Sequence, residues 1–240
     1  MNLQAEKLIE NYEKLLKIVE STFNSDRKTK LLKLYGDLEE RLLYCPASSK
    51  DYYHCCFPGG LIFHTLNVIE NAILLDELWT KQGQIKNYTY EELVFSSMNH
   101  DLGKVGDLEQ SYYVESKEKW KKERGELYST NPDLRYMSVS HRSLWLLQQY
   151  DIKYSQTEMI AILLHDGLYD SANEGYLKTY YENKQLRDNL PIILHQSDMM
   201  SMSIERDQFR NETELKKTSP SKSKNSVLNK DIAVQFFKED

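Results

Sequence analysis

The sequence predicts an all-helical protein. Glycine and proline, which interrupt helices, are scarce, with 9 and 5 among 240 residues. The alternation of β-branched and polar residues that marks strands is nearly absent, whereas apolar residues recur at helical spacing along most of the chain. Hydrophobic residues make up 40% of the sequence, which is enough for a sizeable core, and charged residues make up 28%.

Two helices are expected at the N-terminus. Residues 3–20 place Leu8, Tyr12 and Val19 among other apolar residues on one face, opposite a charged face, and residues 27–44 repeat this pattern. We expect these helices to form an antiparallel pair, within a segment 1–48 that packs on the core.

The remaining helices are expected within a domain that spans 49–210. A loop rich in proline, serine and glycine separates it from the N-terminal pair. The periodicity then predicts helices at 61–82, 90–102, 138–150, 156–167 and 189–204. Gly103 follows the second of these and is expected to cap it.

Three less regular segments are also expected. The long polar and aromatic stretch 103–137 is predicted to hold a short helix near 116–125 and to act as a lid. Residues 170–186 are predicted to be a loop with a short helix. From about residue 211 the chain has few apolar side chains, so 211–240 is expected to be a flexible tail, with a possible short helix at its end.

The composition also bears on location and partners. No apolar run approaches the roughly 20 residues of a membrane helix, and the first residues lack the features of a signal peptide. Three cysteines are too few for a disulfide framework, so a cytoplasmic protein is expected. The net charge of −6 argues against a dedicated duplex-DNA binder, but a metal centre can attract phosphate whatever the overall charge.

Five of the six histidines lie within or at the ends of apolar helical segments, and three aspartates accompany them. The histidines are His64, His100, His141, His165 and His195, and the aspartates are Asp101, Asp166 and Asp198. A single such histidine is more often a hydrogen-bonded core residue. Burying this many ionisable groups is costly unless something pairs with them, and a divalent cation supplies that pairing. Imidazoles and carboxylates without thiolates suit Mn, Fe, Zn or Ni, or Mg with more oxygen ligands.

The order of these residues, H…HD…H…H…D, resembles the two-metal members of the HD superfamily over about residues 50–204. The segment from His54 to Val68, HCCFPGGLIFHTLNV, is similar to a motif of HD-type exoribonucleases and related phage proteins. HDLGK at 100–104 is similar to the signature that names the superfamily, and HQSD at 195–198 resembles its terminal motif.

The resemblance implies an HD-domain helical bundle with two divalent metal ions. Its implied ligands are His64, His100, Asp101 and Asp198 for the first ion, and Asp101, as a bridge, with His141 and His165 for the second. Many relatives have a second histidine after the fourth motif, where this chain has Asp166. That carboxylate is expected to accept a hydrogen bond from a ligand or to act as a general base.

Four further residues are candidate contacts for a substrate. Lys104, which is part of HDLGK, is expected to contact a phosphate or the transition state; the alternative is a solvated lysine at a helix end. His54 is expected to contact substrate or to lie on the surface. His195 is expected to orient a ligand or contact substrate. Arg142 is expected to bind an anionic substrate or to form a salt bridge.

The resemblance implies a phosphohydrolase that cleaves a phosphoester with a metal-activated hydroxide. The expected substrate is a phosphorylated small molecule such as a nucleotide, or a short single-stranded nucleic acid. One alternative is a di-iron oxygenase of the HD type, which acts on a small organic substrate. Another is a regulatory module whose metal site is structural. No membrane partner is expected.

Overall fold

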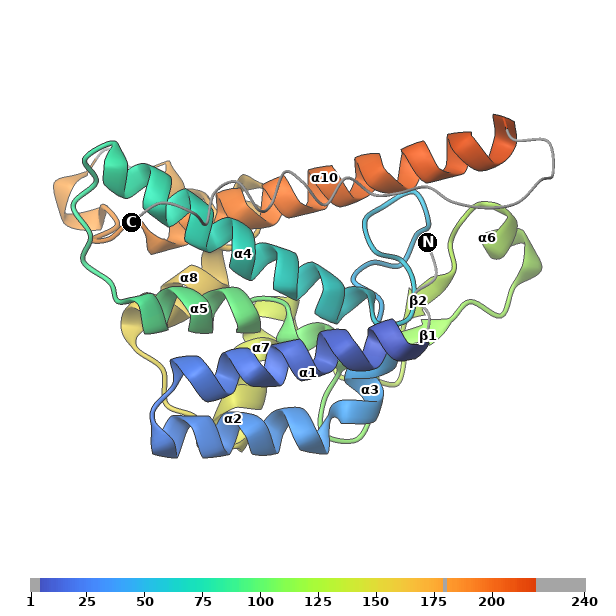
Figure 1. The fold of residues 1–240 in the computed structure, drawn as a ribbon, viewed down its shortest axis with the longest axis horizontal. Helices are drawn as coiled ribbons and strands as arrows, with labels where there is room; N and C mark the ends of the chain where they lie inside the picture. The colour runs from blue at the N-terminus through green and yellow to red at the C-terminus, as the bar shows by residue number, and fades with distance from the viewer. Residues whose placement is uncertain (1–4, 179–180, 219–240) are drawn as a thin grey trace.

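The computed structural model describes residues 5–178 and 181–218, and it confirms the all-α fold (Figure 1). The α-helices are α1 (Ala5–Thr22), α2 (Ser25–Asp37), α3 (Glu39–Tyr44), α4 (Gly60–Lys81), α5 (Tyr90–Asn99), α6 (Lys119–Glu123), α7 (Val139–Gln149), α8 (Gln156–Leu164), α9 (Glu174–Leu177) and α10 (Leu190–Thr218). Short 3-10 helices are η1 (Leu102–Val105), η2 (Gly167–Tyr169), η3 (Ser171–Asn173) and η4 (Glu182–Lys184).

Four helices form the centre of the molecule. α10 packs along α4, α4 packs along α5, and α8 contacts both α5 and α10, so that the four close into a ring. In Figure 1, α10 and α4 cross the upper part of the molecule, α5 lies below them, and α1 and α2 form the lowest layer. α7 packs against η1 and α8 on the outside of this ring.

The N-terminal helices share a hydrophobic core with the ring. Leu15 of α1 and Leu34 of α2 are buried in one cluster with Leu66, Phe95 and Leu146 of α4, α5 and α7. Burial of these side chains is the main favourable contribution to folding.

The second predicted N-terminal helix is in fact two helices. The chain bends at Leu38 (φ −102°, ψ 6°), between α2 and α3. The bend keeps Leu38 and Leu42 buried. It also brings Arg41 to the loop after η1, where its guanidinium donates hydrogen bonds to the carbonyls of Leu108 (3.1 Å) and Gln110 (3.0 Å).

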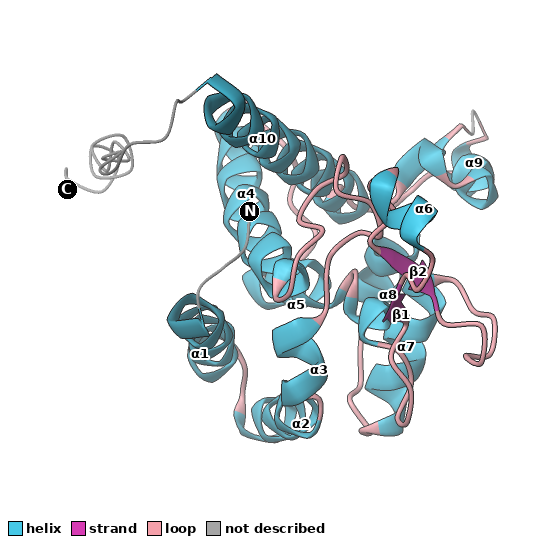
Figure 2. Cartoon of the chain, turned by 90° about the vertical axis from the view of Figure 1, so that its right-hand side faces the viewer, coloured by secondary structure: helices cyan, strands magenta, loops and turns pink. Residues whose placement is uncertain are grey.

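The stretch 103–137 contains the predicted short helix, α6, and also a hairpin that the sequence did not predict. Strands β1 (Tyr113–Glu115) and β2 (Tyr128–Thr130) pair antiparallel, with Val114 opposite Ser129. Three residues are too few for a strand to reveal itself by alternation. Figure 2 shows the two strands and α6 close together.

Residues 211–218, the start of the predicted flexible tail, are helical, because α10 continues through Thr218. Glutamate, leucine and lysine in this stretch are good helix formers, which favours the extension of the helix. The rest of the predicted tail and its possible terminal helix lie outside the described residues.

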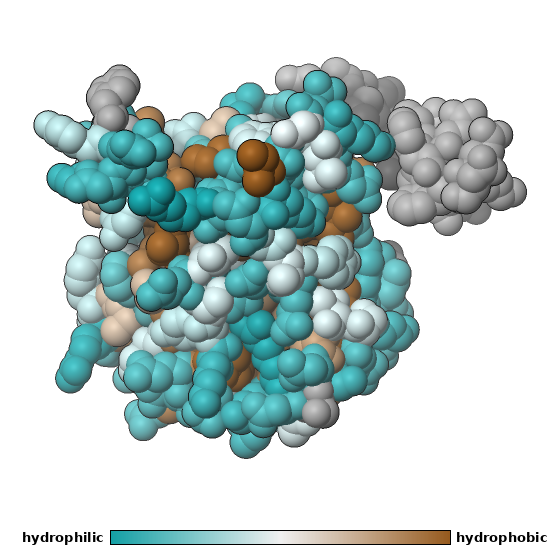
Figure 3. All heavy atoms as spheres, turned by 90° about the vertical axis from the view of Figure 1, so that its left-hand side faces the viewer, coloured by the Kyte–Doolittle hydropathy of each residue, from teal (hydrophilic) through white to brown (hydrophobic). Residues whose placement is uncertain are grey.

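The surface shows no large apolar area on the face drawn in Figure 3. That face is mostly hydrophilic, with apolar residues in small separate spots. Within the described ranges, none of the helices combines the length and the apolar character needed to cross a membrane.

Candidate metal centre

His100 and His165 occupy matching positions at the ends of two helices. His100 caps the C-terminus of α5, and His165 caps that of α8. Each ring donates Nδ1–H to the carbonyl three residues earlier, His100 to Ser97 (2.7 Å) and His165 to Ile162 (2.8 Å). A carbonyl can only accept, so the proton is held on Nδ1 and the lone pair of each Nε2 is free for another partner.

His64 has the same arrangement with a carboxylate in place of the carbonyl. It is fully buried in α4, and its Nδ1 lies 3.0 Å from Oε2 of Glu205 on α10. Asn67, one turn further along α4, donates to the other oxygen of Glu205 at 2.7 Å. The Nε2 atoms of His64 and His100 are both buried without a hydrogen-bond partner. Such unpartnered nitrogens are what a cation site requires.

Two carboxylates face these nitrogens. Asp198 on α10 places Oδ1 at 3.0 Å from Nε2 of His64, although without the geometry of a hydrogen bond. Asp101, between α5 and η1, places its oxygens 3.5 Å from Nε2 of His100 and 3.6 Å from Nε2 of His165. Ligands that share one ion at about 2.1 Å lie roughly 3–3.5 Å apart. The ligand atoms of His64, His100 and Asp101 converge in one group, and those of His100, His165 and Asp198 converge in another.

The electrostatics of the cluster favour positive charge. Burial opposes protonation of His64, but Glu205 and Asp198 outweigh it and raise the pKa of His64 to about 10. Burial likewise opposes protonation of His165, whereas Asp101 and Asp166 raise its pKa to about 9. The C-terminal ends of α5 and α8, which carry partial negative charge, also point at the cluster. A bound cation can take the place of these protons.

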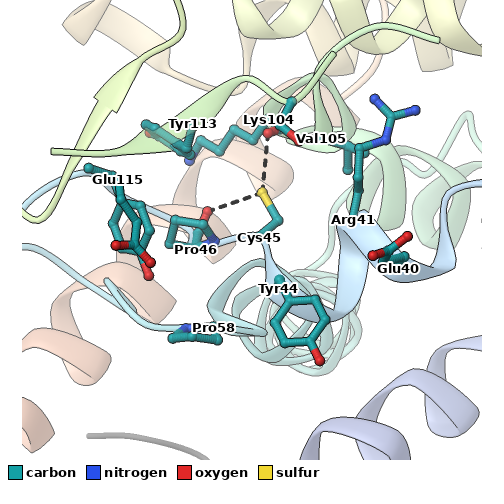
Figure 4. A pocket seen from close by; sticks show the side chains of 12 residues that line it. Glu40, Arg41, Tyr44, Cys45, Pro46, Pro58, Lys104, Val105, Tyr113 and Glu115 are labelled. Atoms are coloured by element: carbon teal, nitrogen blue, oxygen red, sulfur yellow. Dashed lines mark hydrogen bonds between the residues drawn. The ribbon is translucent and has the colours of Figure 1, made fainter. Parts of the chain in front are cut away.

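Lys104 lies at the edge of the cluster and is not a solvated lysine. Its side chain is 15% exposed, and its Nζ lies 2.6 Å from Oδ2 of Asp101. The carbonyl of Lys104 accepts a hydrogen bond from the Cys45 thiol (3.1 Å). Lys104 also lines a cavity of about 470 Å³, which Figure 4 shows between Lys104 and Tyr113 on one side and Tyr44 on the other.

η1 rests directly on α7, which holds the HDLGK turn in place. The Gly103 N–H donates to Oγ of Ser143 (2.8 Å), and that hydroxyl lies 3.1 Å from the carbonyl of His100. A Cβ at Gly103 would collide with the carbonyl of Val139. Gly103 is therefore required for this close approach. The prediction that it caps the preceding helix is wrong, because α5 ends at Asn99.

The structure does not bring two of the predicted site residues to the cluster. His141 is exposed on α7, its Nδ1 lies 2.6 Å from Oγ of Ser138, and it belongs to none of the groups of converging ligand atoms among the described residues. Arg142 is buried, but it lines a different cavity and donates to the carbonyl of Arg135 (2.9 Å).

Asp166, His195 and His54 lie around the cluster. Oδ1 of Asp166 is 3.6 Å from Nε2 of His165, and its side chain is 48% exposed. His195 donates Nδ1–H to the carbonyl of His165 (2.8 Å), so it supports His165 rather than Asp198. The His54 ring centroid lies 4.7 Å from that of His64, and its Nε2 is buried without a hydrogen-bond partner. His54 is thus not a surface histidine.

Sequence reasoning missed Glu205. This residue follows Asp198 by seven positions, which is two helical turns, so both carboxylates share one face of α10. This seven-residue spacing from Asp198 is the sequence feature that could have indicated Glu205 as a member of the cluster. Glu205 is 4% exposed, and with His54 and His64 it forms one of the groups whose ligand atoms converge.

No protein-family model matches this chain, and neither a curated protein nor a solved structure matches it.

Proposed function

We propose that this chain is a metal-dependent phosphohydrolase of the HD superfamily. Its expected substrate is a phosphoester of a nucleotide or a short single-stranded nucleic acid. One observation carries the proposal: a buried cluster of imidazole nitrogens and carboxylates has the Lys104 ammonium 2.6 Å from one of its members, Asp101. A cation and an ammonium side by side suit an anionic phosphoryl group, whose charge grows in the transition state.

The first cation would be held by His64, His100, Asp101 and Asp198. The free Nε2 lone pairs and the distances between ligand atoms support this set. A cation there would supply a Lewis acid and would lower the pKa of a bound water. For the second predicted cation, His165 faces Asp101, but His141 is exposed and paired with Ser138. The geometry therefore supports the first cation more strongly than the second.

The surrounding residues have distinct roles in this proposal. Lys104 binds phosphoryl oxygens, while its contact with Asp101 keeps its ammonium at the cluster. Asp166, which is half exposed beside His165, accepts a proton during the reaction. The cavity beside Lys104, at about 470 Å³, has room for the rest of a small phosphoester.

The test is a panel of nucleotides, cyclic nucleotides and short RNA and DNA, incubated with chelator-treated protein and then with added Mn²⁺. We expect hydrolysis that depends on the metal and is lost in Asp198→Asn. Asp207→Asn, which removes a carboxylate from an exposed position of the same helix, should retain it. If none of the panel members is hydrolysed, the proposal is contradicted.

A second measurement distinguishes the proposed hydrolase from the oxygenase alternative. Protein purified without oxygen is analysed for iron and by electron paramagnetic resonance. Full hydrolytic activity in iron-free protein would exclude an iron oxygenase. Oxygen consumption that requires iron, without hydrolysis, would favour it.

A further inference from the structure

A second cavity, of about 400 Å³, lies beside α7. Its walls come from the loop after η1, the segment before α7, and α7 itself. The residues that line it are Asp107, Leu108, Glu109, Leu134, Arg135, Met137, Arg142 and Trp145. None of the predicted metal ligands is among them, so this cavity is separate from the metal centre.

Arg142 is a buried cation in this cavity wall. Burial lowers the pKa of its guanidinium, and the charge of Asp107 in the same wall only partly offsets this without forming an ion pair. The residue is 3% exposed, and its Nη1 is buried without a hydrogen-bond partner. Its other contacts are Nη2 donating to the carbonyl of Arg135 (2.9 Å) and the guanidinium carbon lying 5.1 Å from the centroid of the Tyr112 ring. Among the described residues, no carboxylate forms an ion pair with it. Burying a guanidinium that has an unpaired N–H group and no ion-pair partner costs free energy unless an anion binds to it.

The rest of the lining determines which anion fits. Leu134, Met137 and Trp145 provide apolar and aromatic surface. Asp107 is already engaged, since its Oδ1 accepts hydrogen bonds from the backbone N–H groups of Glu109 (2.9 Å) and Gln110 (2.7 Å). The carboxylates of Asp107 and Glu109 nevertheless oppose a second negative charge on a ligand, while Arg135 adds one further positive charge to the lining. A single negative charge on an apolar body is the better match.

We propose that this cavity binds a small monoanionic molecule, a carboxylate attached to an apolar body. The carboxylate pairs with the Arg142 guanidinium, whose planar fork of donors matches it. The apolar body lies against Trp145 and Met137. This site is independent of the proposed hydrolase activity, because the cavity shares no residue with the metal ligands.

The test uses benzoate and its neutral counterpart benzamide, which have the same shape and differ in charge. Binding is followed by tryptophan fluorescence, and Trp145→Phe shows which signal arises in the cavity. We expect benzoate to change the fluorescence saturably, with an affinity at least roughly tenfold higher than that of benzamide. Phenyl phosphate, a dianion above about pH 7, should bind more weakly than benzoate.

Variants identify the residue responsible. Arg142→Met removes the charge and keeps much of the apolar stem, and it should lose about tenfold or more in benzoate affinity. Arg142→Lys, which keeps a positive charge, should retain part of the benzoate affinity. Asp198→Asn, at the metal centre, should bind benzoate as the parent does, which separates this site from the proposed active site. Circular dichroism checks that each variant is folded.

Three results would overturn the proposal. They are equal affinity for benzoate and benzamide, benzoate binding that is unchanged in folded Arg142→Met, and no saturable response to benzoate up to about 10 mM.

Discussion

At the scale of single residues, the centre is defined by where imidazole protons are held. His100 and His165 donate Nδ1–H to backbone carbonyls, and His64 places Nδ1 against Glu205. Each Nε2 is therefore left as the nitrogen that faces the carboxylates. Backbone carbonyls cannot be removed by mutation, but the Glu205 carboxylate can, so Glu205 offers the cleanest test of this arrangement.

Glu205→Gln should weaken metal binding while leaving the fold intact. The amide has nearly the same shape, but it no longer carries the negative charge that orients His64 and raises the basicity of its ring. Loss of such a supporting carboxylate typically costs about 10- to 100-fold in metal affinity. Competition with a chromophoric chelator measures the affinity. Asp207→Asn, two residues further along α10 and exposed, is the matched control and should change little.

Much of the cluster could be predicted from the sequence at this scale. His64, His100, Asp101, His165 and Asp198 do lie together. Each histidine was marked by an apolar helix, His100 and His165 also by an adjacent aspartate, and Asp198 by its spacing from His195. His141 was marked in the same way, yet its position near the start of α7 leaves it exposed. Glu205 was missed, because one glutamate in a polar stretch of helix looks like solvated surface until the partner helix is placed.

At the scale of elements, the contact between η1 and α7 connects packing to the site. Gly103→Ala should push η1 away from the Val139 carbonyl and thereby displace Asp101 and Lys104. We expect a loss of about 1–3 kcal/mol in the free energy of unfolding, typical of overpacking, together with weaker metal binding. Urea unfolding and the chelator competition measure the two effects.

Gly36→Ala is the control for that substitution. Gly36 lies in α2, and a Cβ there would meet nothing within 4 Å. Alanine should therefore raise the free energy of unfolding by roughly 0.4–1 kcal/mol, through a less flexible unfolded chain. If both alanine variants shifted stability equally, the close packing of η1 on α7 would not be the cause.

A second inter-element contact joins α2 to α5 and α8. Arg27 forms an ion pair with Glu158 (2.6 Å), which is 1% exposed, and its guanidinium carbon lies 3.7 Å from the centroid of the Phe95 ring. Arg27→Met leaves the Glu158 carboxylate buried without its ion-pair partner. We therefore expect the free energy of unfolding, measured with urea, to fall by about 3 kcal/mol. Lys33→Met, which removes an exposed pair with Asp37 in the same helix, should cost less than about 1 kcal/mol. Similar losses in both variants would contradict a special role for the buried pair.

The existence of the main helices could be predicted, but some of their ends could not. α4, α7 and α8 begin within one residue of the expected positions, since apolar periodicity and capping residues mark them. The ends of α5 and α8 fall earlier than expected, because His100 and His165 turn the chain toward the cluster. The bend at Leu38 and the hairpin β1–β2 depend on contacts with distant segments, which no local pattern encodes.

At the scale of the whole molecule, the ring of α4, α5, α8 and α10 brings together histidines and aspartates that are far apart in the sequence. Each helix of the ring contributes at least one member of the cluster. A cation bound there would connect all four helices and bind only the folded chain. Its binding should therefore stabilise the protein by mass action, by about 2.7 kcal/mol at a free metal concentration of 100 times Kd.

The central claim is that this cluster is a metal centre, and calorimetric titration of chelator-treated protein with Mn²⁺ or Zn²⁺ tests it most directly. The pKa values of His64, raised to about 10, and His165, raised to about 9, mean that both rings are doubly protonated at neutral pH in the metal-free protein, so a cation must displace the proton on Nε2. We predict saturable binding of at least one ion, release of protons to the buffer, and affinity that increases as pH rises from neutrality towards 9. Asp101→Asn should abolish this binding, and His141→Ala should preserve the first ion. The absence of saturable binding, or equal binding by Asp101→Asn, would contradict the account.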